Sequence, residues 1–244
     1  MSHASHEHFR VRDPGDVGAA RRAVEALAQA AAVPMTAVEP ARIATTELGN
    51  NLHLHGQDGY LLLRPTDEPR GLELVAVDRG PGIADPPGAL AGAATAAAGL
   101  GVGLGAVSRL ASSFDLYTDA KQGTVVLARF AADSPAAPAE PVWLRAGGVS
   151  TAVVPGDANG DGWAVAHDEL GCAAVVVDGL GHGPAAHEAS KAALAAFDAC
   201  GAGDVCGWLQ AAHAAMRGTR GAVAAAVRID RTRRRVSFAG VGNV

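Results

Sequence analysis

Glu47 and Asn51 are the first residues in this sequence whose types and spacing suit chemistry. They lie four positions apart in a segment with helical hydrophobic spacing, so both side chains are expected on one helical face. The carboxylate can polarise water or a hydroxyl, and the neighbouring amide oxygen can hold magnesium. The pair suits a nucleoside triphosphate, and a solvated polar face of a helix is the alternative interpretation.

Asp78 stands where an apolar segment, residues 72–77, meets two glycines, Gly80 and Gly82. A strand that ends here would deliver the carboxylate into a turn. In that position it can accept a hydrogen bond from the amino group of adenine. The alternative is an aspartate that only stabilises the turn.

Four glycines alternate along residues 99–105, followed by a helical pattern at 106–111. Glycine lets phosphate approach the backbone, and the free amides at a helix N-terminus bind anions. No Lys-Ser/Thr pair follows the last glycine, which excludes a Walker P-loop. Residues 101–106 match the dinucleotide pattern GxGxxA, but residues 91–98 provide no strand before it. A nucleotide lid is the third interpretation.

The elements that must position these residues follow from hydrophobic spacing and helix signals. One helix is expected after Asp16, and a second runs from Thr36 to Gly56 and carries Glu47 and Asn51. Strands are expected at residues 9–12, 60–64, 72–77, 113–117 and 124–130. Asp78 therefore directly follows a strand, and the glycine-rich stretch lies between two strands.

Taken in order, these motifs and Gly123-Thr124 resemble the GHKL nucleotide-binding family, in particular its anti-sigma-factor and switch-kinase variant. The resemblance covers about residues 9–130 and implies a two-layer α/β sandwich, with Mg-ATP bound between helices and lid. It implies these roles: Glu47 as general base, Asn51 as magnesium ligand, Asp78 and Thr124 as adenine contacts, Gly80 and Gly82 as pocket floor, and Gly101, Gly103 and Gly105 as phosphate-binding amides.

The length of 244 residues exceeds the usual size of a single domain and favours two domains. The Pro/Ala-rich stretch 131–141 is a predicted linker between domains at 1–130 and 142–244. A net charge of −5 makes nucleic acid a poor partner. Three cysteines without a CxxC pair and no apolar run of membrane-spanning length favour a cytoplasmic protein.

Two aspartates, Asp157 and Asp178, are candidates for a second site in the second half. The apolar segment 172–177 leads into Asp178 and the glycine-rich turn 179–183, which precedes a predicted helix starting with Pro184. Carboxylates at strand ends can share divalent cations, and paired cations can drive hydrolysis of a phosphate ester.

This half resembles the SpoIIE/RsbX-like branch of the PPM-type serine/threonine phosphatases, through Gly156-Asp157 and the motifs at 177–183, 219–222 and 240–243. The resemblance implies an α-β-β-α sandwich and Mn²⁺ or Mg²⁺ held by Asp157, Asp178 and the carbonyl of Gly179. Because the family continues past the position of Val244 and supplies another metal aspartate there, the domain is expected to be incomplete.

The sequence thus predicts an α+β, two-domain, cytoplasmic bacterial regulator of partner-switching type. Its main predicted activity is metal-dependent dephosphorylation of phosphoserine or phosphothreonine on an anti-sigma antagonist or stressosome-type protein. One alternative is an anti-sigma serine/threonine kinase that uses Glu47 as base. Another is an ATP-bound module that binds a sigma factor or antagonist and carries an inactive phosphatase fragment. A dehydrogenase, suggested by GxGxxA, would have to bind NAD.

Overall fold

The computed structural model describes residues 5–67, 69–91, 102–131, 143–144, 146–154 and 156–243. The chain divides into two compact units. The first is His8–Pro141, and the second consists of Val142–Val244 together with Met1–Glu7. Ala131 ends a strand of the first unit, and the rest of the predicted linker lies outside the described residues. Among the described residues, no helix has the length and apolar character needed to cross a membrane.

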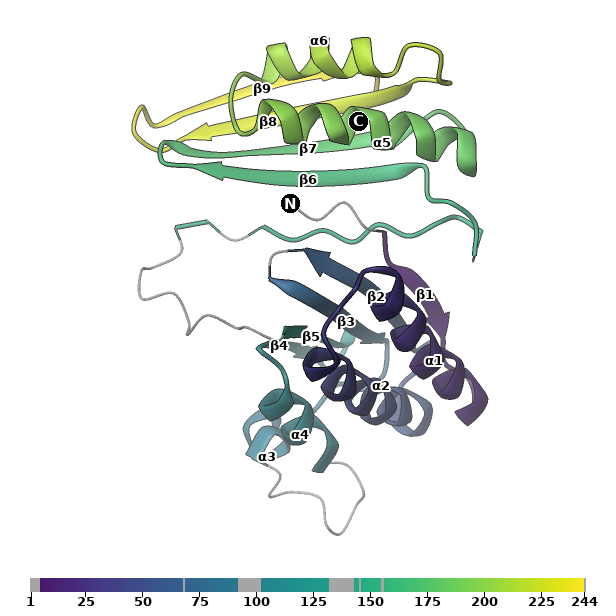
Figure 1. The fold of residues 1–244 in the computed structure, drawn as a ribbon. Coiled ribbons are helices and arrows are strands. Elements are labelled where there is room, and N and C mark those ends of the chain that lie inside the picture. The colour runs from purple at the N-terminus through teal and green to yellow at the C-terminus, as the bar shows by residue number, and fades with distance from the viewer. Residues whose placement is uncertain are drawn as a thin grey trace. The chain divides into compact units, whose positions relative to one another are not determined.

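The first unit is a five-stranded sheet packed against helices, with strand order β1-β2-β3-β5-β4 (Figure 1). Strands β2, β3, β5 and β4 are neighbours joined in antiparallel fashion. The elements are β1 (Glu7–Arg10), α1 (Pro14–Ala30), α2 (Met35–His55), β2 (Tyr60–Asp67), β3 (Arg70–Asp78), α3 (Pro86–Ala91), α4 (Val102–Leu110), β4 (Ser113–Asp119) and β5 (Gly123–Ala131).

Local sequence explains where the first helix starts. Asp13 caps α1 by accepting hydrogen bonds from the amides of Gly15 and Asp16, and the Asp16 carboxylate returns a contact to the backbone of Asp13. Pro14 occupies the first turn, where its missing N–H costs nothing. Alternating apolar residues on β2, β3 and β5 then face α1 and α2, forming one core with Val24, Leu48, Leu61, Leu63, Leu72, Leu74, Val126, Ala128 and Phe130.

An ion network crosses the three central strands. Glu73 on β3 accepts hydrogen bonds from Arg64 Nε on β2 at 2.6 Å and from Arg129 Nε on β5 at 2.7 Å. Arg64 and Glu73 are buried, with 4% and 3% of their side chains exposed. The three residues face one another in the strand register.

Gly49 sets how closely α1 and α2 can pack. A Cβ at this position would lie 2.7 Å from Val17 Cγ1 and 2.9 Å from Cγ2. Val17 is buried, and its β-branched side chain has little rotamer freedom in a helix. The two helices therefore touch at a point where only glycine fits.

The change Gly49→Ala is expected to lower the free energy of unfolding by about 1–3 kcal/mol, because the extra methyl overpacks the contact. Urea unfolding followed by far-UV circular dichroism measures this. Gly18→Ala is the matched control, since its Cβ would meet only Arg22 Nη1 at 3.5 Å and alanine favours a helix. Equal stability of Gly49→Ala and wild type would contradict the proposed close contact.

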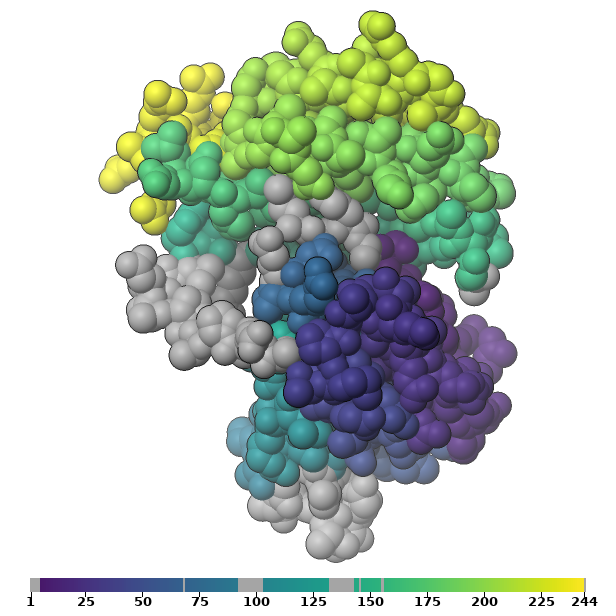
Figure 2. Space-filling model, viewed as in Figure 1, coloured from purple at the N-terminus to yellow at the C-terminus, as the bar shows by residue number. Residues whose placement is uncertain are grey.

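The second unit is a four-stranded antiparallel sheet in sequence order, covered on one face by two helices (Figure 1). Figure 2 shows the atoms of these helices, in green, side by side on the surface of the unit. Phe197 and Trp208 join them through an edge-to-face contact in the core. The elements are β6 (Asp161–Asp168), β7 (Gly171–Gly179), α5 (Pro184–Cys200), α6 (Val205–Ala215), β8 (Ala222–Asp230) and β9 (Arg235–Val241).

Two expectations differ from the structure. The described residues of the second unit form one sheet and one helical layer, so an α-β-β-α sandwich is not present within them. The helix expected from residue 106 begins at Val102 in the structure. The sequence missed its first turn because glycines at alternate positions hide the helical spacing of apolar residues. Gly103 and Gly105 consequently belong to α4 rather than to the loop before it.

Candidate functional site

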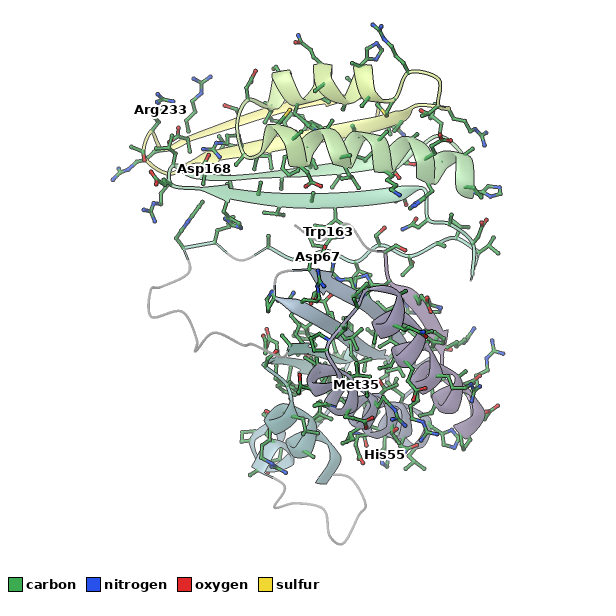
Figure 3. All side chains as sticks on the ribbon, in the orientation of Figure 1. Met35, His55, Asp67, Trp163, Asp168 and Arg233 are labelled. Atoms are coloured by element: carbon green, nitrogen blue, oxygen red, sulfur yellow. The ribbon has the colours of Figure 1, made fainter. Side chains whose placement is uncertain are left out.

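A pocket of about 390 Å³ opens in the first unit beside the C-terminal half of α2. His55, labelled in Figure 3, lies at the end of α2 and belongs to its wall. The strands β3 and β5 supply another wall, and the segment after β3 together with α3 and α4 supplies the rest. The lining residues are Leu48, Asn51, Leu52, His55, Gly56, Ala76, Asp78, Pro81, Gly82, Ile83, Ala84, Asp85, Ala89, Leu104, Thr124 and Val126.

Asp78 is the half-buried acid of this pocket. It is the last residue of β3 and faces Thr124 across the β3–β5 register. Burial raises the pKa of its carboxyl, opposed by hydrogen bonds from the backbone amides of Gly80 and Thr124. The Gly80 amide donates to Asp78 Oδ1 at 2.6 Å. One carboxylate oxygen is thereby fixed among mostly apolar walls.

The turn after β3 depends on two glycines. A Cβ at Gly80 would lie 2.7 Å from Asp78 Oδ1 and 3.0 Å from the carbonyl oxygen of His55. Gly82 has φ of +72°, in the left-handed region that glycine adopts without strain. Ile83 then donates its amide to Thr118 Oγ1 at 2.8 Å, which fixes the turn against β4. These contacts hold the chain in the path that forms the pocket.

Glu47 lies one helical turn before Asn51 on α2 and is half-buried. It is not among the described residues that line the pocket. Its carboxylate faces α4 instead: a Cβ built on Gly103 would lie 2.5 Å from Glu47 Oε2. Glu47 is therefore at the contact between α2 and α4, next to the residues that form the pocket wall.

The structure brings together Asn51, Asp78, Gly82 and Thr124, four of the residues selected from the sequence. Gly80 contacts Asp78 from the adjacent turn. Gly103 and Gly105 lie in α4, whereas Gly101 is outside the described residues. Sequence reasoning did not select the apolar wall, although Leu48 and Leu52 flank Asn51 at helical spacing and gave a signal. The other unselected apolar members are Ala76, Pro81, Ile83, Ala84, Ala89, Leu104 and Val126.

The raised pKa of Asp78 makes the stability of the ligand-free protein depend on pH. A carboxyl whose folded-state pKa is raised stabilises the fold below the unfolded-state value, about 3.9 for aspartate, and this stabilisation is lost as pH rises through the folded-state value. Asp78→Asn is therefore expected to raise the melting temperature at neutral pH and to leave it unchanged below the ordinary aspartate pKa. Thermal unfolding at both pH values tests this, and an equal shift at both would contradict it.

In the second unit, Asp178 pairs with Asp161, a residue not selected from the sequence. The two face each other in the β6–β7 register. Burial, the charge of Asp178 and a hydrogen bond with its side chain raise the pKa of Asp161. Asp157 lies instead beside Gly183, whose Cβ would be 3.3 Å from its Oδ2, and the Gly179 amide donates to the Gly160 carbonyl. Within the described residues, no cluster of three or more His, Cys, Asp or Glu could hold a metal ion.

Comparison with known proteins matches residues 11–130 to the histidine kinase-like ATPase domain. Serine/threonine-protein kinase RsbT of Bacillus subtilis (strain 168) is 35% identical over 95 residues, which cover 37% of this chain and 71% of RsbT. A chain from a solved structure titled "The bacterial stressosome: a modular system that has been adapted to control secondary messenger signaling" is 39% identical, with a TM-score of 0.33. The match covers 34% of this chain and 44% of that one, less than half its length.

These matches correct the expected enzyme class. The sequence reasoning placed the main activity in a metal-dependent protein phosphatase, but the matched family is an ATPase domain and the matched relative is named a kinase. The phosphatase prediction rested on four short glycine-containing motifs, at 156–157, 177–183, 219–222 and 240–243, and on a resemblance to a family that they suggested. In the structure one of these aspartates, Asp178, faces Asp161, a residue that the sequence reasoning did not select.

Proposed function

This chain belongs to the histidine kinase-like ATPase family, and we propose that its first unit binds Mg-ATP and phosphorylates a serine or threonine of a partner protein. The observation that carries the proposal is the pocket beside α2, where Asp78 stands as the half-buried acceptor between apolar walls. The relative named as a serine/threonine-protein kinase supports the reaction class.

The pocket suits the base of a nucleotide. Its volume of about 390 Å³ falls in the range of small-molecule sites. Leu48, Leu104 and Val126 provide apolar surface for the faces of a purine ring, and Asp78 provides an acceptor for an exocyclic amino group. Thr124 opposite Asp78 adds a hydroxyl. We infer that adenine occupies this end of the pocket.

The phosphates are expected toward Asn51 and α4. Asn51 belongs to the pocket lining, and a side-chain amide oxygen is a suitable ligand for Mg²⁺. Bound Mg²⁺ would neutralise charge on the phosphate oxygens. Gly103 is the second residue of α4, so its amide is one of those that a helix leaves without an intrahelical partner. Gly105 would hold α4 close to α3, since its Cβ would be 2.5 Å from the carbonyl oxygen of Leu90.

Transfer to a protein hydroxyl requires a base near the γ-phosphate. The serine or threonine oxygen forms a bond to the γ-phosphorus, and the bond from that phosphorus to the bridging oxygen of ADP breaks. ADP leaves with that electron pair, and the hydroxyl proton passes to the carboxylate of Glu47. Glu47 is one helical turn from Asn51 on α2, so the acceptor hydroxyl is expected at the phosphate end of the pocket.

We propose a stressosome-type scaffold protein as the phosphate acceptor, in line with the resemblance of residues 9–130 to switch kinases. The second candidate is a module that binds a sigma factor or antagonist and uses ATP only as a structural ligand. The position of Glu47 outside the described pocket lining favours this second candidate. Phosphate transfer distinguishes the two.

The test incubates the full chain with [γ-³³P]ATP and a purified stressosome scaffold protein from the same organism. Label on serine or threonine of the scaffold, together with calorimetric binding of ATP and not of NAD, supports the kinase. A stoichiometric complex in ATP without label would overturn it in favour of the binding module. Binding of NAD in place of ATP would overturn both.

A further inference from the structure

Nine-residue helix α4 contains two glycines, which weaken a helix by about 0.5–1 kcal/mol each relative to alanine. Gly105 is explained by the close approach of the Leu90 carbonyl at 2.5 Å from a built Cβ. Gly103 is in a right-handed helix, and positive-φ glycines among the described residues do not include it. The reason for a glycine at position 103 must therefore lie in its surroundings.

Gly103 packs along the side chain of Glu47. A Cβ at this position would lie 2.5 Å from Glu47 Oε2 and 3.5 Å from both Cβ and Cδ of the same residue. The contact thus extends over the length of the glutamate. Among the described residues, the three heavy atoms nearest to the built Cβ all belong to Glu47. The bare Cα of Gly103 defines where this carboxylate can lie.

We propose that Gly103 is a positioning residue for Glu47: by presenting no side chain, it leaves the space in which the carboxylate meets the acceptor hydroxyl. This inference rests on the proposed kinase function. It assigns to Gly103 a task separate from any amide contact with phosphate, because the Cα hydrogens and the amide point in different directions. A carboxylate displaced by about 1 Å loses much of its catalytic effect.

Gly103→Ala separates the two roles. The atom in its way is the far end of a flexible side chain, so the glutamate can rotate while α4 keeps its place and gains helix propensity. The amide remains. We expect kcat for phosphorylation of the scaffold protein to fall about ten- to a hundredfold, with KM for ATP within about twofold of wild type. The melting temperature should be unchanged or slightly higher.

A double-mutant cycle identifies the cause. In a Glu47→Gln background, Gly103→Ala should have no further effect on the residual rate, because the group it displaces is no longer a base. Gly18→Ala is the matched control in α1 and should change neither rate. An unchanged kcat for Gly103→Ala, or an equal loss in both backgrounds, would overturn the proposal.

Failure of the kinase function is recognised separately. If wild type binds ATP but labels no scaffold protein, the proposed function fails, and the position of Glu47 is then read from its ¹³C carboxyl resonance, assigned with Glu47→Gln. A shift of that resonance in Gly103→Ala but not in Gly18→Ala supports the contact. An unmoved resonance overturns it.

Discussion

Replacement of Glu47 by glutamine is expected to slow phosphorylation of the scaffold protein by about 10²- to 10⁴-fold, the usual contribution of a general base. Glutamine has nearly the same shape but cannot take the hydroxyl proton. ATP affinity should stay close to that of wild type, because Glu47 is not among the described residues that line the pocket. Single-turnover transfer from [γ-³³P]ATP and calorimetry measure the two quantities.

The matched control is Glu39→Gln. Glu39 lies on the same helix, two turns earlier, with about half of its side chain exposed and an ion pair to Arg42 at 2.8 Å. An exposed pair of this kind contributes little to stability, so this variant should retain full activity. Equal rates for Glu47→Gln and wild type would remove Glu47 from the mechanism and favour a different base.

The second large effect is expected at Asp78. Asp78→Asn should weaken ATP binding by about 100-fold or more, equivalent to about 3 kcal/mol. The Gly80 amide donates to Asp78 Oδ1 at 2.6 Å. If the asparagine oxygen keeps this hydrogen bond, its NH₂ group faces the amino group of adenine, and two donors meet. If the oxygen turns toward adenine instead, the hydrogen bond from Gly80 is lost. Isothermal calorimetry with ATP, at a pH where the protein is folded, tests this.

Asp58→Asn is the control for the change of charge. Asp58 is exposed and pairs with Arg10 at 2.8 Å, and its positive φ of 50° is a conformation that asparagine tolerates. It should leave ATP affinity unchanged. Undiminished ATP binding by Asp78→Asn would mean that adenine binds elsewhere. A variant that binds less ATP yet unfolds at a higher temperature would show that the acid is retained for binding at a cost in stability.

Much of the candidate site could be predicted because its residues carry local signals. Asn51 has helical spacing, and Asp78 follows an apolar strand and precedes two glycines. Asp78 and Thr124 face each other because of the register between β3 and β5. That register cannot be read from the sequences of the two strands. The apolar wall was missed because residues such as Leu104 cannot be told from ordinary core residues until the fold places them at a cavity.

The second unit shows why short motifs are weaker evidence. The segment 172–183 reads as a strand that delivers Asp178 into a glycine-rich turn, and the structure does contain that strand and turn. The sequence could not supply the residue that faces Asp178 across the sheet. Cross-strand pairing brings Asp178 to Asp161, seventeen residues earlier in the numbering, and nothing in the spacing favours Asp161 over Asp157.

The ion network of Arg64, Glu73 and Arg129 has a consequence for the accuracy of folding. A slip of one residue between β2, β3 and β5 would turn Glu73 toward the leucines of the core and separate it from both guanidinium groups. An unpaired buried charge costs several kcal/mol, so misaligned sheets are rejected. Asp78 lies five residues further along the same strand and faces Thr124 in the same pairing. The three charges thus favour the native strand register, and the same register places Asp78 opposite Thr124 in the pocket.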